Sequence, residues 1–267
     1  MTDRDEYYNR AKQEGYRARS AYKLKQLDET TGLFGPGNIV VDLGAAPGGW
    51  LQVAAEAVGD DGVVIGVDRQ RIDPIEDVPA RVETLRGDIT EAETHGAIRE
   101  RATALGGTDD GPGGPVDVVL SDLAPNMTGE YDLDHARSVH LARQAADVAR
   151  AVLATGGDFA VKVFQGRDLE ALESDLAADF EYVRRVVPEA SREASSELYL
   201  VCKGFLTAPI RPGEKMTVKI TDVGSEGDGV ADVDGYTLFV PDTEAGETVT
   251  VRVEECKPRY GFAERID

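Results

Sequence analysis

A glycine-rich stretch at residues 40–50 constrains the fold of this chain more than any other feature. It reads Val-Val-Asp-Leu-Gly-Ala-Ala-Pro-Gly-Gly-Trp, and the apolar residues 51–58 that follow have the composition of a helix. A β-branched run, a tight turn and a helix start form, in that order, a cradle of backbone N–H groups for a nucleotide-like ligand. The stretch therefore predicts an α/β domain that binds its ligand at the end of a strand.

The spacing of the glycines narrows the class of ligand. Gly44, Gly48 and Gly49 do not match the Gly-x-Gly-x-x-Gly pattern of dinucleotide-binding folds, which disfavours a nicotinamide-dependent dehydrogenase. Trp50 and Leu51 stand where a phosphate-binding loop carries Lys and then Ser or Thr. The loop therefore suits a nucleoside without phosphates, such as S-adenosylmethionine. A strand, turn and helix without any ligand remains the alternative for this loop alone.

Strand-like and helical patterns alternate through the first 205 residues. Runs with the composition of strands recur at 39–42, 63–68, 82–85, 116–121, 159–164, 182–187 and 198–203. Helical periodicity fills most of the gaps, notably 133–153 and 169–180. This alternation predicts a Rossmann-like domain over residues 1–205, with a mostly parallel seven-stranded sheet and helices on both faces.

Polar residues stand at or just beyond the ends of these predicted strands. They are Asp42, Asp68, Asp88, Asp122 and Lys162. Because ligands of parallel sheets bind beyond the carboxyl ends of the strands, we expect these side chains to line one site. Asp68 is placed to accept hydrogen bonds from ribose hydroxyls, and Asp88 to contact an adenine amino group. Each carboxylate alone could equally be a helix cap, but together with the glycine loop they favour adenosine.

Two charged residues interrupt apolar strand runs. Lys162 stands in Val-Lys-Val-Phe, and Glu197 precedes Leu-Tyr-Leu-Val. A charge among buried apolar residues is costly unless it is paired or faces a cleft. Lys162 is therefore a candidate functional residue, whereas Glu197 by itself could be a charge at the start of a strand.

Acidic residues dominate the chain, except near its beginning. Fifty acidic and 29 basic residues give a formal charge of -21, which is typical of a cytoplasmic protein from a halophile. Residues 1–27 instead carry seven basic and four acidic residues. This basic segment predicts contact with a polyanion, with tyrosines for base stacking, although a helix with exposed arginines is the alternative. The tyrosines are Tyr7, Tyr8, Tyr16 and Tyr22.

Other classes of protein find little support. No apolar run approaches the roughly 20 residues that span a bilayer, and no signal-peptide pattern opens the chain. Cys202 and Cys256 form no paired motif, and the three histidines have no metal-ligand spacing. We expect a cytoplasmic protein with no bound metal and no membrane contact.

The composition changes after residue 205. Pro209, Pro212 and Gly213 indicate a linker, and short alternating runs follow at 216–220, 229–233, 236–240 and 248–253. Turn signals such as Asp234-Gly235 separate the runs. Residues 206–267 therefore predict a small antiparallel β-barrel.

Five motifs together resemble the FtsJ/RrmJ family of ribose 2′-O-methyltransferases, the RlmE type that acts on large-subunit ribosomal RNA. They occur in family order over about residues 4–205. The motifs are Ser-Ala-Tyr-Lys-Leu with Lys23, Asp-Leu-Gly-Ala-Ala-Pro-Gly-Gly-Trp, Ser-Asp-Leu-Ala-Pro-Asn-Met, Val-Lys-Val-Phe-Gln-Gly and Ser-Ser-Glu-Leu-Tyr. The tail resembles a TRAM domain, an OB-like RNA-binding barrel, through Glu226-Gly-Asp-Gly-Val-Ala and Thr237-Leu-Phe-Val-Pro.

The resemblance implies roles for particular residues. It implies a catalytic set of Lys23, Asp122, Lys162 and Glu197. It also implies S-adenosylmethionine as cofactor, with contacts at Gly48, Trp50, Asp68, Asp88 and Asp122. The implied substrate is a uridine ribose in the A-loop of 23S ribosomal RNA in the large subunit. Because TRAM modules also accompany tRNA-modifying enzymes, a tRNA ribose methyltransferase remains open, as does a non-catalytic RNA-binding assembly factor. The acidic composition suggests a halophilic archaeon as the source.

Overall fold

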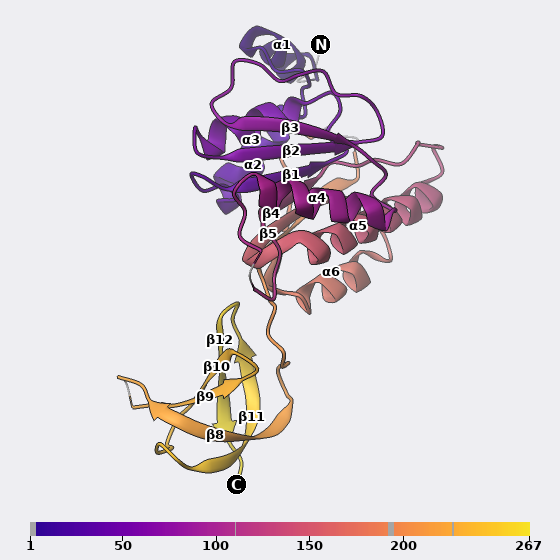
Figure 1. The fold of residues 1–267 in the computed structure, drawn as a ribbon. Coiled ribbons are helices and arrows are strands. Elements are labelled where there is room, and N and C mark those ends of the chain that lie inside the picture. The colour runs from indigo at the N-terminus through magenta and orange to yellow at the C-terminus, as the bar shows by residue number, and fades with distance from the viewer. Residues whose placement is uncertain (1–3, 110, 192–194, 226) are drawn as a thin grey trace.

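The structure, a computed structural model, describes residues 4–109, 111–191, 195–225 and 227–267. It contains an α/β unit built on one sheet and a separate β-barrel near the C-terminus (Figure 1). Within the described residues no helix is both long enough and apolar enough to cross a membrane. We propose that the boundary between the two units lies after residue 205, where the last strand of the sheet ends.

Seven strands form the sheet in the order β3-β2-β1-β4-β5-β7-β6. They are β1 (Ile39–Leu43), β2 (Val63–Asp68), β3 (Arg81–Arg86), β4 (Val116–Ser121), β5 (Leu153–Phe164), β6 (Phe180–Val186) and β7 (Glu197–Phe205). Neighbouring strands from β3 to β5 are parallel, and β7 runs antiparallel to both β5 and β6. The prediction of a mostly parallel seven-stranded sheet is confirmed.

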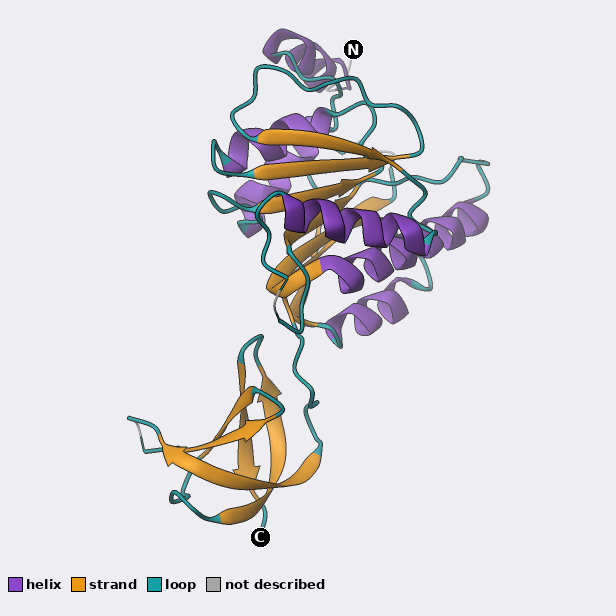
Figure 2. Cartoon of the chain, in the orientation of Figure 1, coloured by secondary structure: helices purple, strands orange, loops and turns teal. Residues whose placement is uncertain are grey.

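Helices cover both faces of the sheet (Figure 2). They are α1 (Arg4–Glu14), α2 (Ala21–Thr31), α3 (Gly49–Val58), α4 (Ala92–Ala104), α5 (Tyr131–Val152) and α6 (Leu169–Ala177). Side chains of α2 and α3 belong to one buried apolar cluster, and those of α4, α5 and α6 to another. The sheet is thus the middle of three layers, as the alternating pattern predicts.

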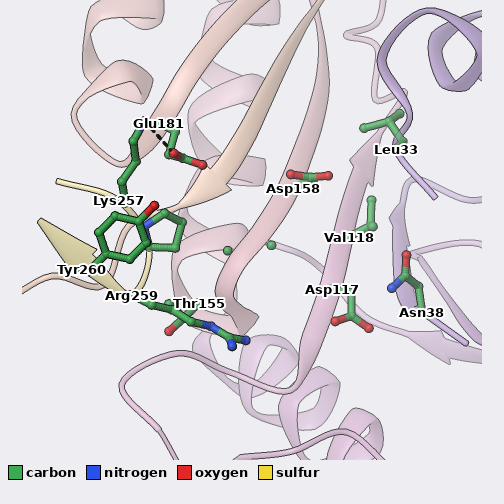
Figure 3. Close-up of a pocket in the computed structure, with 13 residues that line it drawn as sticks. Leu33, Asn38, Asp117, Val118, Thr155, Asp158, Glu181, Lys257, Arg259 and Tyr260 are labelled. Atoms are coloured by element: carbon green, nitrogen blue, oxygen red, sulfur yellow. Dashed lines mark ion pairs between the residues drawn. The ribbon is translucent and has the colours of Figure 1, made fainter. Parts of the chain in front are cut away.

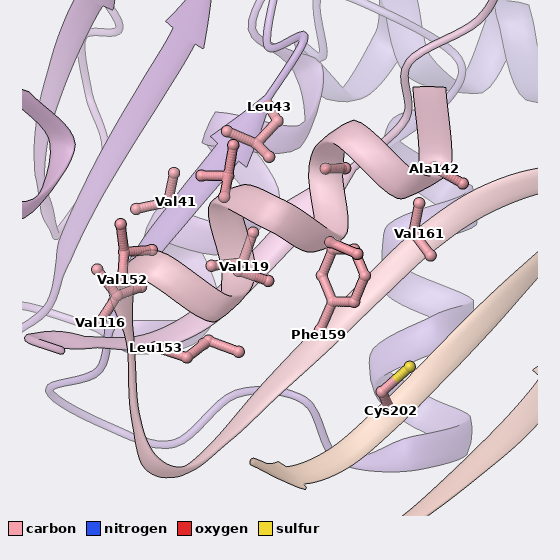
Figure 4. Close-up of a cluster of buried hydrophobic side chains, with 14 of the residues drawn as sticks. Val41, Leu43, Val116, Val119, Ala142, Val152, Leu153, Phe159, Val161 and Cys202 are labelled. Carbon is pink, nitrogen blue, oxygen red and sulfur yellow. The ribbon is translucent and has the colours of Figure 1, made fainter. Parts of the chain in front are cut away.

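Successive residues of the central strands supply the two clusters in turn. Val40 of β1 joins the cluster beneath α2 and α3, whereas its neighbour Val41 joins the cluster beneath α4, α5 and α6. Figure 4 shows the second cluster, where Phe159 and Val161 of β5 lie against α5. Because both faces are covered, these strands are apolar throughout, and a charged residue within them stands out.

Five strands close the barrel in the order β10-β12-β11-β8-β9. They are β8 (Lys215–Val223), β9 (Gly229–Val233), β10 (Tyr236–Val240), β11 (Thr248–Cys256) and β12 (Tyr260–Arg265). The predicted barrel is present, but the expectation that it is wholly antiparallel is wrong, because β10 and β12 pair in parallel. Closing an odd number of alternating strands forces one parallel pair. Of the predicted TRAM motif, Glu226 lies outside the described residues.

The barrel meets the α/β unit at the amino ends of the sheet strands. The Lys257 ammonium lies 3.2 Å from a carboxylate oxygen of Glu181. The hydroxyls of Thr155 in β5 and Thr207 in the connection are 2.8 Å apart. A cavity of about 700 Å³ lies at this junction, with Asp117 and Asp158 on one side and Lys257 and Tyr260 on the other (Figure 3).

Candidate active site

The carboxyl edge of the sheet brings the four predicted catalytic residues together. Asp122 directly follows β4, and Lys162 lies two residues before the end of β5. Because β7 is antiparallel to β5, its first residue, Glu197, pairs with the last residue of β5, Phe164. Lys23 in α2 reaches the same edge, where its ammonium forms an ion pair with Glu197. Residues separated by up to 174 positions in the chain therefore meet at one place.

Two lysine–carboxylate pairs make up this cluster. The Lys162 ammonium donates hydrogen bonds to the carbonyl oxygen of Asp122 at 2.6 Å and to its carboxylate Oδ1 at 2.8 Å. The Lys162 side chain is 7% exposed, and those of Lys23 and Glu197 are 12% and 11% exposed. Ions held so far from water are costly unless they are paired, so each pair depends on its partner.

The environment of Glu197 keeps its carboxylate charged. Burial alone would raise the pKa of Glu197, but the Lys23 ammonium, aided by Ser191 and Lys162, outweighs burial and lowers the pKa below its usual value. The effect of Lys162 also shows that the two pairs lie within electrostatic reach of each other. A charged Glu197 supplies the anion of the ion pair that holds the Lys23 side chain at this edge.

Tyr199 joins the cluster, although the sequence analysis does not single it out. Its hydroxyl donates a hydrogen bond of 2.7 Å to Asp122 Oδ1, and its ring lies 5.8 Å from that of Trp50, measured between ring centroids. Burial, reinforced by the charge of Asp122, raises the pKa of Tyr199 well above its usual value, so the phenol stays a donor. A tyrosine inside a buried strand requires a partner for its hydroxyl, and this requirement is the signal that could have identified it.

Asp42, at the end of β1, carries a buried carboxylate without a hydrogen-bond partner among the described residues. The residue is 1% exposed, and neither of its oxygens has a donor. Burial, followed by the charges of Asp122 and Asp68, raises the pKa of Asp42 well above its usual value. A buried acceptor without a donor is costly, so Asp42 is a candidate ligand-binding residue at this edge.

The carboxylates predicted to bind adenosine also lie at this edge. Asp68 accepts hydrogen bonds from the backbone N–H groups of Ala46, in the glycine loop, and of Gln70. Asp88 accepts from the backbone N–H and the hydroxyl of Thr90, and the backbone hydrogen bond is the main reason that its pKa is lowered. Both side chains are only partly buried, so they can accept further hydrogen bonds from a ligand. Their contacts with a cofactor stay a prediction.

The glycine loop is closely packed by its neighbours. Gly48 has a φ of +110°, and a Cβ there would lie 2.6 Å from Cδ1 of Ile75. Arg17 ties the loop to the segment at 73–75, because its guanidinium donates to the carbonyl oxygens of Pro47, Asp73 and Pro74. The loop is therefore held in one shape before any ligand arrives.

Trp50, the other predicted cofactor contact in the loop, is 3% exposed. Its indole N–H donates to the carbonyl oxygen of Ser20 at 2.8 Å. This bond joins the start of α3 to Ser20, the residue before α2. Helix α2 carries Lys23. The side chain therefore helps to hold α2 against α3 at this edge of the sheet, and any contact between Trp50 and a cofactor stays a prediction.

The basic N-terminal segment contributes several buried side chains to the core, which its composition does not predict. The prediction that its tyrosines offer base-stacking surfaces is wrong for Tyr16 and Tyr22, which are 9% and 3% exposed and pack in the core beneath α2 and α3. Tyr7 packs partly against the same core, whereas Tyr8 is 59% exposed. Aromatic residues buried against α2 help to position the helix that carries Lys23.

The described part of the chain contains no group of three or more His, Cys, Asp or Glu side chains that could hold a metal ion. The side chains that the cluster offers for chemistry are amines, carboxylates and a phenol. Two amines and three carboxylates beside a glycine loop can position a nucleophile, accept its proton and hold a cationic ligand.

Comparisons with known proteins agree with this geometry. Residues 16–205 match the model of the FtsJ-like methyltransferase family, and residues 209–266 match the TRAM domain. The chain is 61% identical over 267 residues to the ribosomal RNA large subunit methyltransferase E of Haloarcula marismortui, covering all of both chains. It is 44% identical over 264 residues to the protein of that name in Methanothrix thermoacetophila, covering 99% of this chain and 97% of the other.

A solved structure shares the α/β unit. It is described as a putative ribosomal RNA methyltransferase from Plasmodium falciparum, and it is 28% identical with a TM-score of 0.58. The match covers 71% of this chain and 98% of that one.

Proposed function

The chain belongs to the FtsJ-like methyltransferase family and carries a TRAM domain, and from this premise we propose that it methylates a ribose 2′-hydroxyl of large-subunit ribosomal RNA. The methyl donor is S-adenosylmethionine, and the target is a uridine in the A-loop of 23S ribosomal RNA. The enzyme works in the cytoplasm, with this RNA or the large subunit as its partner. The relatives named for large-subunit methylation, similar over the whole chain, support the choice of RNA.

One observation carries the proposal: two lysines and two carboxylates from four separate elements form adjoining ion pairs beside the glycine loop. Charged side chains that serve only solubility lie exposed on the surface and do not gather in a buried cluster of this kind. Transfer of a methyl group to a hydroxyl, in contrast, needs an oriented oxygen and an acceptor for its proton.

The edge of the sheet also fits the methyl donor. S-adenosylmethionine supplies a methyl group on a positively charged sulfur, which makes that methyl group electrophilic. Asp42, whose two buried oxygens have no donor among the described residues, is the candidate acceptor for the amino group of the ligand. Asp68 and Asp88 suit its ribose hydroxyls and adenine amino group, and Gly48 and Trp50 are the expected contacts in the glycine loop.

Lys162 is placed to take the proton that the 2′-hydroxyl loses. With the methyl donor bound, the 2′-hydroxyl would pass its proton to the Lys162 amine as its oxygen takes the methyl group, and the sulfur would keep the electron pair of the broken bond. Lys162 would first have to release one proton of its ammonium to solvent, because only the neutral amine can accept a proton. Asp122 orients that amine through its carbonyl and carboxylate oxygens, and Tyr199 holds the carboxylate in turn. Lys23, fixed by Glu197, supplies a positive charge that favours the developing alkoxide.

The proposal is tested by following methyl transfer from labelled S-adenosylmethionine to 23S ribosomal RNA and to tRNA from a strain lacking this protein. We expect a single 2′-O-methyl group in the A-loop, which is absent from the strain and restored by the purified enzyme. If only tRNA became labelled, tRNA and not 23S ribosomal RNA would be the substrate. Tight RNA binding without labelling of naked RNA or of isolated large subunits would indicate a non-catalytic assembly factor.

A further inference from the structure

Three large apolar side chains stand in solvent immediately beyond the catalytic Asp122. Met127 is 63% exposed, Tyr131 57% and Leu133 39%. They belong to the loop between β4 and α5 and to the first turn of α5, which project past the carboxyl end of the sheet (Figure 2). Grouped apolar exposure on an otherwise highly acidic protein points to a surface that is covered when the protein works.

Tyr131 is fixed directly to the catalytic edge. Its hydroxyl donates a hydrogen bond of 2.7 Å to the carbonyl oxygen of Gln165, three residues beyond Lys162. The backbone N–H of Gln165 in turn donates to the carbonyl oxygen of Ser196, the residue before Glu197. The anchored phenol oxygen leaves the ring exposed at the rim of the site, where its face is available for stacking.

The loop that carries Met127 is also held in one conformation. The buried Asp134 carboxylate accepts three hydrogen bonds, from the backbone N–H groups of Thr128 and Gly129 and from the Thr128 hydroxyl, each 2.9 Å long. The Arg137 guanidinium donates to the carbonyl oxygen of Asn126 at 3.3 Å. A rigid apolar surface loses little conformational entropy when it is covered.

Residues 164–168, which follow the end of β5, are also held to α5 by hydrogen bonds. The buried His135 lies with Nδ1 3.0 Å from the carbonyl oxygen of Phe164, and its Nε2 accepts from the backbone N–H of Asp168 at 3.1 Å. This arrangement holds residues 164–168 in place, including the 79% exposed side chain of Arg167. Arg137 and Arg167 are exposed cations beside the apolar surface that can contact an RNA backbone, although Arg167 also pairs with Asp168 at 3.5 Å and Glu130 and Asp132 flank Tyr131.

We propose that Met127 and Tyr131 form a stacking shelf for the RNA base next to the methylated nucleotide. The inference rests on the proposed function, because it takes RNA as the substrate. Tyr131 receives the face of the base, Met127 covers its edge, and the arginines contact the flanking phosphates. Stacking also suits a protein of this charge, because concentrated salt weakens phosphate contacts far more than it weakens stacking.

The test compares Tyr131→Ala, Tyr131→Phe and Met127→Ala with Tyr182→Ala, a matched control on β6 with an equally exposed ring. Methylation of an A-loop RNA is measured at high salt as separate kcat and KM values. We expect Tyr131→Ala to raise KM about 5- to 100-fold, with a smaller change in kcat. Tyr131→Phe keeps the ring and should stay within about threefold of wild type, as should the control.

A spectroscopic signature distinguishes stacking from a merely structural role. RNA with 2-aminopurine beside the target nucleotide should lose fluorescence on binding wild type and Tyr131→Phe, but not on binding Tyr131→Ala. If the wild-type enzyme methylates the RNA but Tyr131→Ala shows an unchanged KM and unchanged quenching, the proposal of a stacking shelf is wrong. A defect seen only on assembled subunits would instead assign the surface to a ribosomal protein. Absence of wild-type methylation on every RNA would count against the proposed function itself.

Discussion

The two edges of the sheet each contain a buried lysine–carboxylate pair, yet they differ in what those pairs leave unsatisfied. At the amino edge, Lys203 pairs with Asp158 and also donates to the carbonyl oxygen of Gly32, while the backbone N–H of Gly204 donates to Asp158. Both carboxylate oxygens there have partners within the protein. The hydrogen bonds within the protein therefore satisfy the carboxylate of this pair, as expected for an ion pair with a structural role.

The carboxyl edge is less complete. Lys162 and Asp122 are paired there, but the neighbouring Asp42 keeps two buried oxygens that have no donor in the part of the chain that the structure describes. A single buried ion pair is therefore weak evidence of catalysis, whereas two adjoining pairs beside a buried acceptor without a donor distinguish the carboxyl edge as a candidate site. The predictions below test this distinction.

Replacement of Lys162 with Ala should have the largest effect, because it removes the proton acceptor. We expect kcat to fall about 10³-fold, within the range for a general base, while the affinity for S-adenosylmethionine changes little. Single-turnover methylation and calorimetric titration measure the two quantities. Normal turnover would exclude Lys162 from the mechanism.

Lys203→Ala is the counterpart at the amino edge and should reduce stability without changing the chemistry. It leaves Asp158 partly buried without its cation, so we expect a loss of about 3 kcal/mol with kcat near wild type. Burial already raises the pKa of Asp158, against the opposing effect of Lys203. The loss should therefore shrink as the pH falls and Asp158 becomes protonated. Denaturant unfolding at pH 5 and pH 8 measures it, and an equal loss at both would contradict the assignment.

Asp42→Asn should stabilise the free protein but weaken binding of the methyl donor. The folded-state pKa of Asp42 is raised, so its ionisation reduces stability as the pH rises above the unfolded value of about 3.9. The neutral amide removes that cost, and we expect a gain of about 1–2 kcal/mol at pH 8 that disappears towards pH 4. Affinity for S-adenosylmethionine should fall about tenfold. Lower stability at pH 8 would show that Asp42 has a donor after all.

Tyr199→Phe should have the smallest effect, because it removes one hydrogen bond and keeps the ring. The Asp122 carboxylate would retain Lys162 but lose its second partner, so we expect about 1 kcal/mol less stability. We also expect a kcat reduced about three- to tenfold at unchanged KM. A change in KM without a change in kcat would mean that Tyr199 acts on RNA binding instead.

The sequence was sufficient to predict the sheet and the edge at which the polar residues after its strands gather, because both depend on short-range patterns. Apolar runs mark strands covered on both faces, and Lys162 is conspicuous because it interrupts one. The convergence of Lys23 with Glu197 followed from family resemblance, since nothing in the local pattern of α2 indicates its partner across the sheet.

Other features depend on tertiary contacts that have no local signal. The rings of Tyr16 and Tyr22 are buried because α2 packs beneath the sheet, which the basic composition of residues 1–27 conceals. The parallel closure of the barrel depends on β12, a strand that begins at Tyr260 and that the tail pattern does not reveal. The lack of a donor to Asp42 among the described residues likewise becomes apparent only from the tertiary structure.

The junction between barrel and sheet sets a fixed separation along the molecule. Thr155, beside the barrel, and Lys162, at the catalytic edge, are seven residues apart on the single strand β5, which corresponds to about 23 Å. A continuous strand cannot shorten, so the two units can grip one RNA only where its points of contact are at least that far apart. The enzyme would then select its substrate by the folded architecture of the RNA as well as by local nucleotide identity.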